Sequence, residues 1–227
     1  MYKKIFKNQV WHLISIIIAV IVLQVIINCD EGIIGGSLFG VSTNRWFWIA
    51  ILIPIIHQIY VFIVWRLELY TRIFTRKFGL KKAFKIYAAG FSILFVLRFI
   101  TVIVLAFSNR KTLDINPIYM HIIAVVITPF VIYLFYSVKK YFTFERAFGI
   151  DHFDKGYDVP YVKKGIFRYT NNGMYIFGLA ILYLPGLLLL SKAAILVAFF
   201  NHVYIWVHYY TVELPDMRYI YKKIPKE

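Results

Sequence analysis

Two polar, aromatic stretches near the C-terminus, GIFRYTNNGMYIFG (residues 165–178) and HYYTVELPDMRYIY (residues 208–221), are expected to form turns and frame a pair of apolar runs. The runs, residues 174–190 and 193–210, are separated by only two residues, so they predict a helical hairpin. A hairpin returns its two ends to the same side, so both stretches can contribute to one pocket. Its candidates are Asn171, Asn172, Tyr175, His208, Glu213, Asp216 and Arg218. We interpret the rest of the chain as the bundle that holds this hairpin.

The composition identifies an integral membrane protein. Of the 227 residues, 61% are hydrophobic and 16% are charged, whereas soluble domains have about 25% charged residues. Six apolar runs approach or exceed the ~18 to 20 residues that cross a bilayer: 11–27, 46–65, 86–107, 118–138, 174–190 and 193–210. One cysteine excludes an intrachain disulfide and a cysteine-rich metal site. The predicted fold is an all-α polytopic bundle of about six transmembrane helices with a C-terminal hairpin.

The basic residues predict the orientation. The net charge is +15, and 21 of the 26 lysines and arginines fall at the two termini, in residues 66–85 or in residues 139–168. Because lysine and arginine accumulate in cytoplasmic loops, both termini and the polar stretch 139–172 are predicted to be cytoplasmic. The positive charge is explained by topology and anionic headgroups, so it does not indicate nucleic-acid binding.

The two stretches resemble the phospholipid methyltransferase family, which includes phosphatidylethanolamine N-methyltransferases and, more distantly, isoprenylcysteine carboxyl methyltransferases. Members typically carry G-x-Y/F-R/K-Y-x-x-N/H-P-M-Y-x-x-G before the hairpin and Glu-Glu-Pro or Glu-x-Pro-Asp/His-Met after it. The matching residues are Gly165, Phe167, Arg168, Tyr169, Asn172, Met174, Tyr175, Gly178 and the segment ELPDMRYIY at 213–221. FERAFGIDHFD, residues 144–154, also resembles the phospholipid branch, so the resemblance covers about residues 141–221. Two positions depart from the pattern: Gly173 replaces the usual proline, and Leu214 replaces the second acid.

The resemblance implies S-adenosylmethionine as the methyl donor. Its amine requires an acidic acceptor, and its carboxylate requires backbone N–H groups or a cation. Glu213 is the strongest candidate for the amine or the ribose, against the alternative of a solvated helix end. Asn171, Asn172 and Gly173 either bind the cofactor through backbone N–H groups or form a turn with an Asn N-cap. The full set of cofactor-binding candidates is Tyr169, Asn171, Asn172, Gly173, Tyr175, Gly178, Glu213, Asp216 and Arg218.

Methylation of an amine requires that the amine first lose a proton to a nearby carboxylate, histidine or tyrosine. The catalytic candidates are His208, Asp151 and His152. We expect His208 to lie nearer the membrane surface than His202. Asp151 and His152 come from the family-like segment and are predicted to close the pocket on the headgroup side; the alternative is an ordinary polar loop.

Arg98 is a separate signal, because a charge in the middle of an apolar run is costly unless it faces a partner or a polar cavity. It is the candidate substrate-binding residue, for a lipid phosphate, against the alternative of pairing with a helix carbonyl. No metal-binding spacing occurs among the six histidines.

These observations predict an S-adenosylmethionine-dependent methyltransferase of a lipid amine, phosphatidylethanolamine-like, at the cytoplasmic face of a bacterial inner membrane or the endoplasmic reticulum. Residues 1–140 are predicted to form a four-span bundle and residues 141–227 a cofactor-binding module with two spans. The expected partners are a lipid acceptor and the bilayer, with no nucleic acid or metal; the oligomeric state does not follow from the sequence. Two alternatives stay open: a carboxyl methyltransferase of a prenylated cysteine or other lipophilic acceptor, and a non-catalytic accessory or transport protein.

Overall fold

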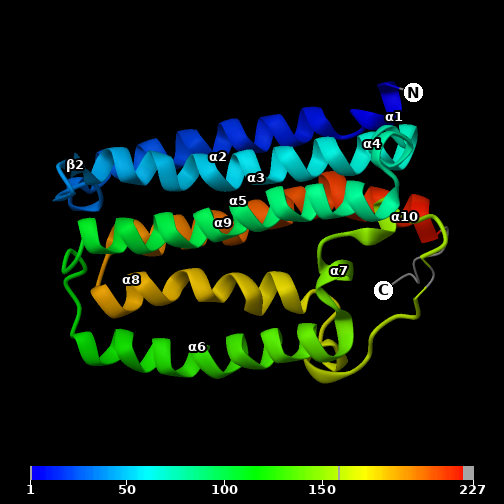
Figure 1. Ribbon diagram of the computed structural model, residues 1–227. Coiled ribbons are helices and arrows are strands. Elements are labelled where there is room, and N and C mark those ends of the chain that lie inside the picture. The colour runs from blue at the N-terminus through cyan, green and yellow to red at the C-terminus, as the bar shows by residue number, and fades with distance from the viewer. Residues whose placement is uncertain (1, 158, 222–227) are drawn as a thin grey trace.

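The computed structural model describes residues 2–157 and 159–221, and Figure 1 shows them as long helices that run side by side. Lys222, Lys223 and Lys226, three of the basic residues counted above, lie outside the described residues. The longer helices are α2 (Gln9–Cys29), α3 (Thr43–Thr71), α5 (Leu80–Ser108), α6 (Pro117–Ser137) and α9 (Lys192–His208). Shorter ones are α1 (Tyr2–Ile5), α4 (Ile73–Phe78), α7 (Phe144–Ala147), α8 (Tyr183–Leu189) and α10 (Leu214–Tyr221).

The prediction of an all-α membrane bundle is confirmed. Five continuous helical stretches are long and apolar enough to cross a membrane: Tyr2–Cys29, Thr43–Thr71, Leu80–Ser108, Pro117–Phe142 and Lys192–Tyr221. The predicted fifth run corresponds to a shorter apolar helix, Met174–Leu189. That helix is irregular, because a π-turn (Met174–Gly178) and a 3-10 turn (Leu179–Leu182) precede α8.

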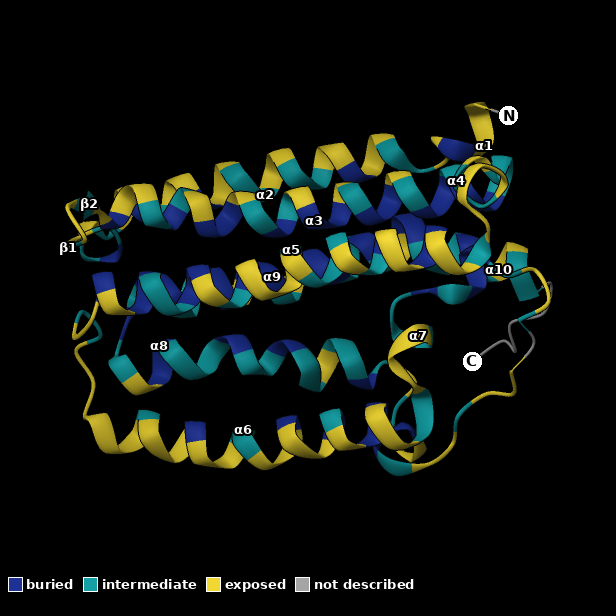
Figure 2. Ribbon diagram, viewed as in Figure 1, coloured by how far each residue is buried: buried dark blue, intermediate teal, exposed yellow. Residues whose placement is uncertain are grey.

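The peripheral helices present apolar faces to the outside. α5 and α9 pack against each other and against α3 and α8, whereas α2 and α6 lie at opposite edges (Figure 1). Figure 2 shows both edge helices as largely exposed. On α2 the exposed residues recur every four positions at Leu13, Ile17, Ile21 and Val25, each about half exposed or more. An apolar helix face of this kind is stable in contact with lipid tails.

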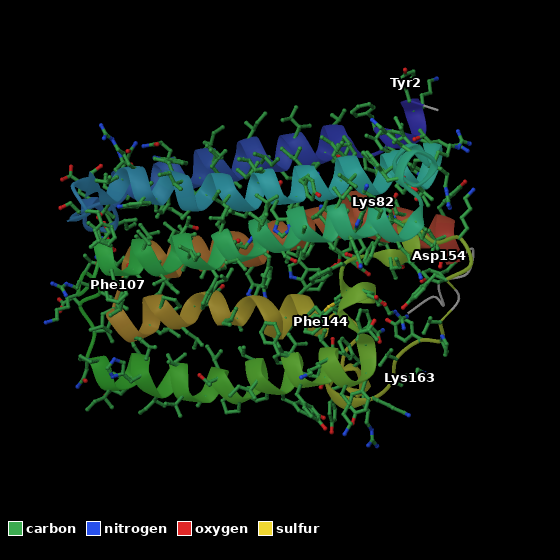
Figure 3. The ribbon with its side chains drawn as sticks, in the orientation of Figure 1. Tyr2, Lys82, Phe107, Phe144, Asp154 and Lys163 are labelled. Carbon is green, nitrogen blue, oxygen red and sulfur yellow. The ribbon has the colours of Figure 1, made fainter. Side chains whose placement is uncertain are left out.

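One end of the bundle carries both described chain ends. Figure 3 places Tyr2, Lys82, Asp154 and Lys163 at that end and Phe107 at the other. The opposite end carries a small antiparallel pair, β1 (Ser37–Leu38) with β2 (Val41–Ser42), and the turns into α6 and α9. We call these the basic end and the distal end.

A single asparagine ties the connections together at the distal end. Asn109 Nδ2 donates to the carbonyls of Gly32 and Gly35 at 2.9 and 2.8 Å. Its Oδ1 accepts from the backbone N–H of Ala193 at 3.0 Å, at the start of α9. The residue is 1% exposed, so it satisfies the polar backbone of three segments where water is excluded.

The stretch 208–221, expected to form a turn, is helical throughout, and that expectation was wrong. α9 continues through a π-turn (Tyr209–Glu213) into α10. Pro215 has no N–H to offer the carbonyl of Thr211 four residues earlier, so an ordinary helix would leave that carbonyl unpaired. Arg66 of α3 supplies the missing donor, with Nη2 at 2.9 Å from the Thr211 oxygen. A tertiary contact therefore lets the helix pass its proline.

The stretch 139–172, which is polar in composition, contains short helical segments and buried residues. Its first residues continue α6 as a π-turn (Val138–Phe142), and α7 and two 3-10 turns, Ile150–His152 and Gly165–Arg168, follow. Asp151 and His152 are 6% and 1% exposed, and Phe153 is fully buried with Trp65 and Tyr87. The alternative of a solvated polar loop for Asp151 and His152 is therefore wrong.

Candidate active site

The hairpin brings the two sequence stretches into contact at the basic end. Tyr175, in the π-turn of the first stretch, donates its hydroxyl hydrogen to Glu213 Oε2 in the π-turn of the second. The Tyr175 ring also packs edge-on against Trp206 and Tyr209. A carboxylate held by one tyrosine keeps further acceptor capacity for a ligand amine or hydroxyl. This contact joins the two motifs as the hairpin predicted.

A buried ionic network lies beside this pair. Arg66 Nε donates to both oxygens of Asp216 at 3.1 and 3.2 Å, and its Nη1 donates to the carbonyls of Ile5 and Lys7. Arg66 and Asp216 are 0% and 1% exposed. The guanidinium therefore joins the N-terminal segment, α3 and α10. Both oxygens of Asp216 accept from Arg66, so the surroundings of Asp216 favour an ion pair over the predicted contact with the cofactor.

His152 extends the network to the segment between α7 and the hairpin. Its Nδ1 lies 3.0 Å from Asp151 Oδ1, and its Nε2 lies 3.8 Å from Asp216 Oδ2. The Tyr221 hydroxyl donates to the other oxygen of Asp151 at 3.0 Å. Burial acts to lower the pKa of His152, but the two carboxylates outweigh it and raise that pKa to about 9. Likewise, burial acts to raise the pKa of Asp151, but bonds to His152 and Tyr221 lower it overall.

An aromatic wall holds His152 in place. The Trp65 indole stacks on the imidazole with ring centroids 4.0 Å apart and an interplanar angle of 21°. Gly149 lies against the same indole at a φ of +81°, where an added Cβ would come within 2.5 Å of the Trp65 ring. The glycine of the FGIDHF sequence is therefore required by both backbone angle and space.

His208 is buried in the bundle, although it lies six residues nearer the basic end of its span than His202 does. It is 2% exposed, whereas His202 is only partly buried. The His208 ring lies 6.0 Å from the Trp65 ring and 6.2 Å from the ring of His12 on α2. Neither ring nitrogen of His208 has a hydrogen-bond partner among the described residues. The cause is the helical continuation at 209–221, which moves the true end of the span beyond His208.

Arg98 is also buried, at 3% exposure, and its Nε and Nη2 atoms have no hydrogen-bond partner within the described part of the chain. The alternative of pairing with a helix carbonyl does not hold for these atoms. Its nearest ionisable neighbours include Tyr204 and His57, whose electrostatics its charge affects.

The remaining candidates do not converge on the Tyr175–Glu213 pair. Tyr169 is 75% exposed, and Asn171 and Arg218 are exposed as well. Gly173 and Gly178 face α6, where an added Cβ would lie 3.6 and 3.0 Å from Leu134 atoms. These two glycines therefore allow the fifth span to approach α6 closely. Asn172 is half-buried, and its carbonyl accepts the N–H groups of Tyr175 and Ile176, as a residue at a helix start does.

A comparison with family descriptions matches residues 117–224 to the phospholipid methyltransferase family. Residues 117–224 belong to that family. The match runs from α6 past the described end of α10, so it contains both stretches of the hairpin and the Asp151–His152 turn. No curated protein and no solved structure matches the chain. The resemblance found in the sequence is thereby confirmed, and the chain is a multi-pass membrane protein with a phospholipid methyltransferase segment.

The residues of this phospholipid methyltransferase segment suit the methionine end of S-adenosylmethionine. Glu213 offers the anionic acceptor that an amine requires, and Tyr175 fixes its orientation. No group of three or more His, Cys, Asp or Glu residues that could hold a metal occurs in the described ranges.

Sequence reasoning missed four buried residues of this interior: Arg66, Trp65, Tyr87 and His57. Arg66 was counted only as a topogenic charge, and Trp65 and Tyr87 only as apolar residues. His57 carried a usable signal, because it is a polar residue within an apolar run. All four precede residue 117, so they lie outside the segment that matches the family.

Proposed function

We propose that this protein transfers a methyl group from S-adenosylmethionine to the amine of a phosphatidylethanolamine-like lipid at the cytoplasmic face of the membrane. The observation that carries the proposal is the contact between Tyr175 and Glu213, which joins the two family motifs in one half-buried place. A lipid amine as acceptor fits the phospholipid branch that FERAFGIDHFD resembles.

Glu213 is the residue proposed to bind the cofactor's amine. Bound S-adenosylmethionine supplies an electrophilic methyl group, and in-line displacement requires mainly alignment of the two reactants. Tyr175 orients Glu213, while the turn at Asn172 and Gly173 offers backbone N–H groups to the carboxylate end. Cofactor binding by Tyr169, Asn171, Gly178 and Arg218 stays a prediction. Gly178 contacts α6, and the other three side chains face solvent.

His208 is proposed to accept the proton that the acceptor amine loses. A neutral imidazole has one acceptor nitrogen, and both His208 nitrogens are without a partner in the described structure. His152 is unsuited to this role at neutral pH, because the pKa of about 9 keeps it protonated. We therefore assign Asp151 and His152 to positioning: together they hold Asp216, and thus α10, against Trp65.

Lipid analysis after expression tests the function directly. The full chain is expressed in a host that lacks methylated phosphatidylethanolamine, membranes receive S-adenosylmethionine labelled in its methyl group, and extracted lipids are separated. We expect label in the phosphatidylethanolamine derivatives, and a loss of most label for Glu213→Gln. Glu145→Gln on exposed α7 is the matched control and should label as wild type does.

The outcomes separate the alternatives. Label in a carboxyl ester that mild base releases would favour the carboxyl methyltransferase. A purified wild type that neither labels lipid nor binds S-adenosylhomocysteine would refute catalysis and leave the accessory or transport role.

A further inference from the structure

Three buried cationic or ionisable groups lie on α3, α5 and α9, which pack against one another. They are His57 of α3, Arg98 of α5 and His208 of α9, exposed by 2%, 3% and 2%. Both ring nitrogens of each histidine, and Nε and Nη2 of Arg98, make no hydrogen bond to any described residue. Buried polar groups are nearly always bonded to something, and an unpaired buried charge is especially costly. A ligand that accepts hydrogen bonds would remove that cost.

The three side chains lie at a common depth. From the distal end, His57 is fourteen residues into α3 and His208 sixteen residues into α9, or about 21 and 24 Å at 1.5 Å per residue. Arg98 is ten residues from that end of α5, or about 15 Å. Helical side chains lean toward the N-terminus of their helix. Because α5 runs opposite to α3 and α9, Arg98 extends toward the histidines.

The electrostatics of the group select an anion. The charge of Arg98 acts on both His57 and His208, and His57 also acts on His208. Among the described residues, no carboxylate is one of the groups that act on these three. A planar guanidinium with two free donors matches a phosphate or carboxylate oxygen pair.

The polar interior continues from this group toward the cofactor residues. Trp65 and Tyr87 are also buried, interact with each other, and lie in the cluster that contains Phe153. Glu213 is five residues beyond His208, about 8 Å further toward the basic end. The interior thus offers anion donors at one level and aromatic rings, with Glu213, at the next.

We propose that Arg98 and His57 bind the phosphodiester of the acceptor lipid, with its amine directed toward His208, Trp65 and Tyr87. This inference rests on the proposed function, which it extends by naming the residues that select a phosphodiester-bearing acceptor. Aromatic faces attract a cationic amine, so the Trp65–Tyr87 level suits the ammonium before it loses its proton. Arg98 and His57 both precede residue 117, so spans outside the family match supply the phosphate donors.

Lipid binding, measured apart from methyl transfer, tests the inference. The purified full chain, saturated with S-adenosylhomocysteine, is titrated with short-chain phosphatidylethanolamine and with an N-acyl ethanolamine that lacks phosphate. Arg98→Met and His57→Phe remove the donors, Arg98→Lys keeps the charge, and Arg110→Met at the exposed distal end is the matched control. Thermal unfolding and S-adenosylhomocysteine affinity report whether each variant is folded.

Wild type should bind the phospholipid about tenfold more tightly than the N-acyl ethanolamine, or better, because only the phospholipid can accept charge-assisted hydrogen bonds through a phosphate. Arg98→Met and His57→Phe should lose that preference while keeping their cofactor affinity; Arg98→Lys should keep part of it, and Arg110→Met all of it. A folded Arg98→Met variant with wild-type phospholipid affinity would overturn the assignment. So would inorganic phosphate binding as tightly as the lipid, because the site would then serve a free anion. A wild type that does not bind S-adenosylhomocysteine but still prefers the phospholipid would refute the methyltransferase function and support the phosphate site.

Discussion

Replacing Arg66 with methionine should destabilise the bundle more than any other single arginine change at the basic end. Arg66→Met removes the nearer cation paired to Asp216, whose carboxylate is 1% exposed, and leaves it only the longer contact with His152 at 3.8 Å. Breaking a buried ion pair from one side costs about 3–5 kcal/mol, because the remaining charge stays buried and uncompensated. The carbonyl of Thr211, which Pro215 cannot serve, also loses its donor. We expect a loss of free energy of unfolding of about 3–5 kcal/mol.

Reversible unfolding of the full chain in mixed detergent micelles measures this loss. The double variant Arg66→Met/Asp216→Leu removes both charges and should recover much of the stability, since paired removal of a buried ion pair is often neutral. Arg45→Met, at an exposed position of α3, is the matched control and should change the free energy of unfolding little. A loss below about 1 kcal/mol for Arg66→Met, the range of exposed ion pairs, would refute the reasoning. A double variant no more stable than the single one would do the same.

Four further predictions concern cofactor binding, pH dependence, a left-handed glycine and the orientation in the membrane. Glu213→Gln should weaken S-adenosylhomocysteine binding by roughly ten- to a hundredfold in isothermal titration, because a charge-assisted bond contributes about 1.5–3 kcal/mol; equal affinity would contradict its role. The folded-state pKa of His152, about 9, exceeds its ordinary value of 6.5, so its stabilisation is complete below about pH 6.5 and is lost as the pH rises through 9. The free energy of unfolding should therefore fall by about 1.4 kcal/mol per pH unit across that window, and a His152→Gln variant that falls as steeply would exclude this cause. Gly165→Ala should lower stability by at least about 1 kcal/mol, because its φ of +61° is left-handed and its Cβ would meet a serine of α6; an unchanged unfolding midpoint would count against it. Cysteines placed at Ser42 and Lys155, in a chain without its native cysteine, should react with an impermeant reagent in sealed cells only at Ser42; reaction at Lys155 would reverse the proposed orientation.

The sequence was sufficient for the features that depend on local composition. Apolar runs long enough to cross a bilayer predicted the helices, since hydropathy dominates structure in a membrane. The short link between residues 190 and 193 predicted the hairpin, and the two motifs at its ends predicted that Tyr175 and Glu213 would approach each other.

Features that depend on tertiary contacts could not be predicted in this way. Pro215 and the charges around it suggested a turn after the last span. The helix continues there because Arg66, 145 residues from Thr211 in the chain, donates to the carbonyl that Pro215 leaves unpaired and pairs with Asp216. The same contact changes Asp216 from a cofactor candidate into half of an ion pair. A local sequence pattern does not identify which distant residues will pack together. The burial of His208 and His152, which depends on such packing, was therefore underestimated as well.

The two reactants reach the proposed site from different phases, and the division of the chain fits that requirement. S-adenosylmethionine is charged and water-soluble, so its site must open at the membrane surface, where the family segment places Glu213 near the basic end. A phospholipid arrives within the bilayer, so its phosphate must leave water to enter the bundle and needs compensating donors at that depth. Arg98 and His57 provide such donors from spans that precede the family match. If this division holds, changes in the first spans should alter which lipid is methylated, while changes at Glu213 alter cofactor affinity alone.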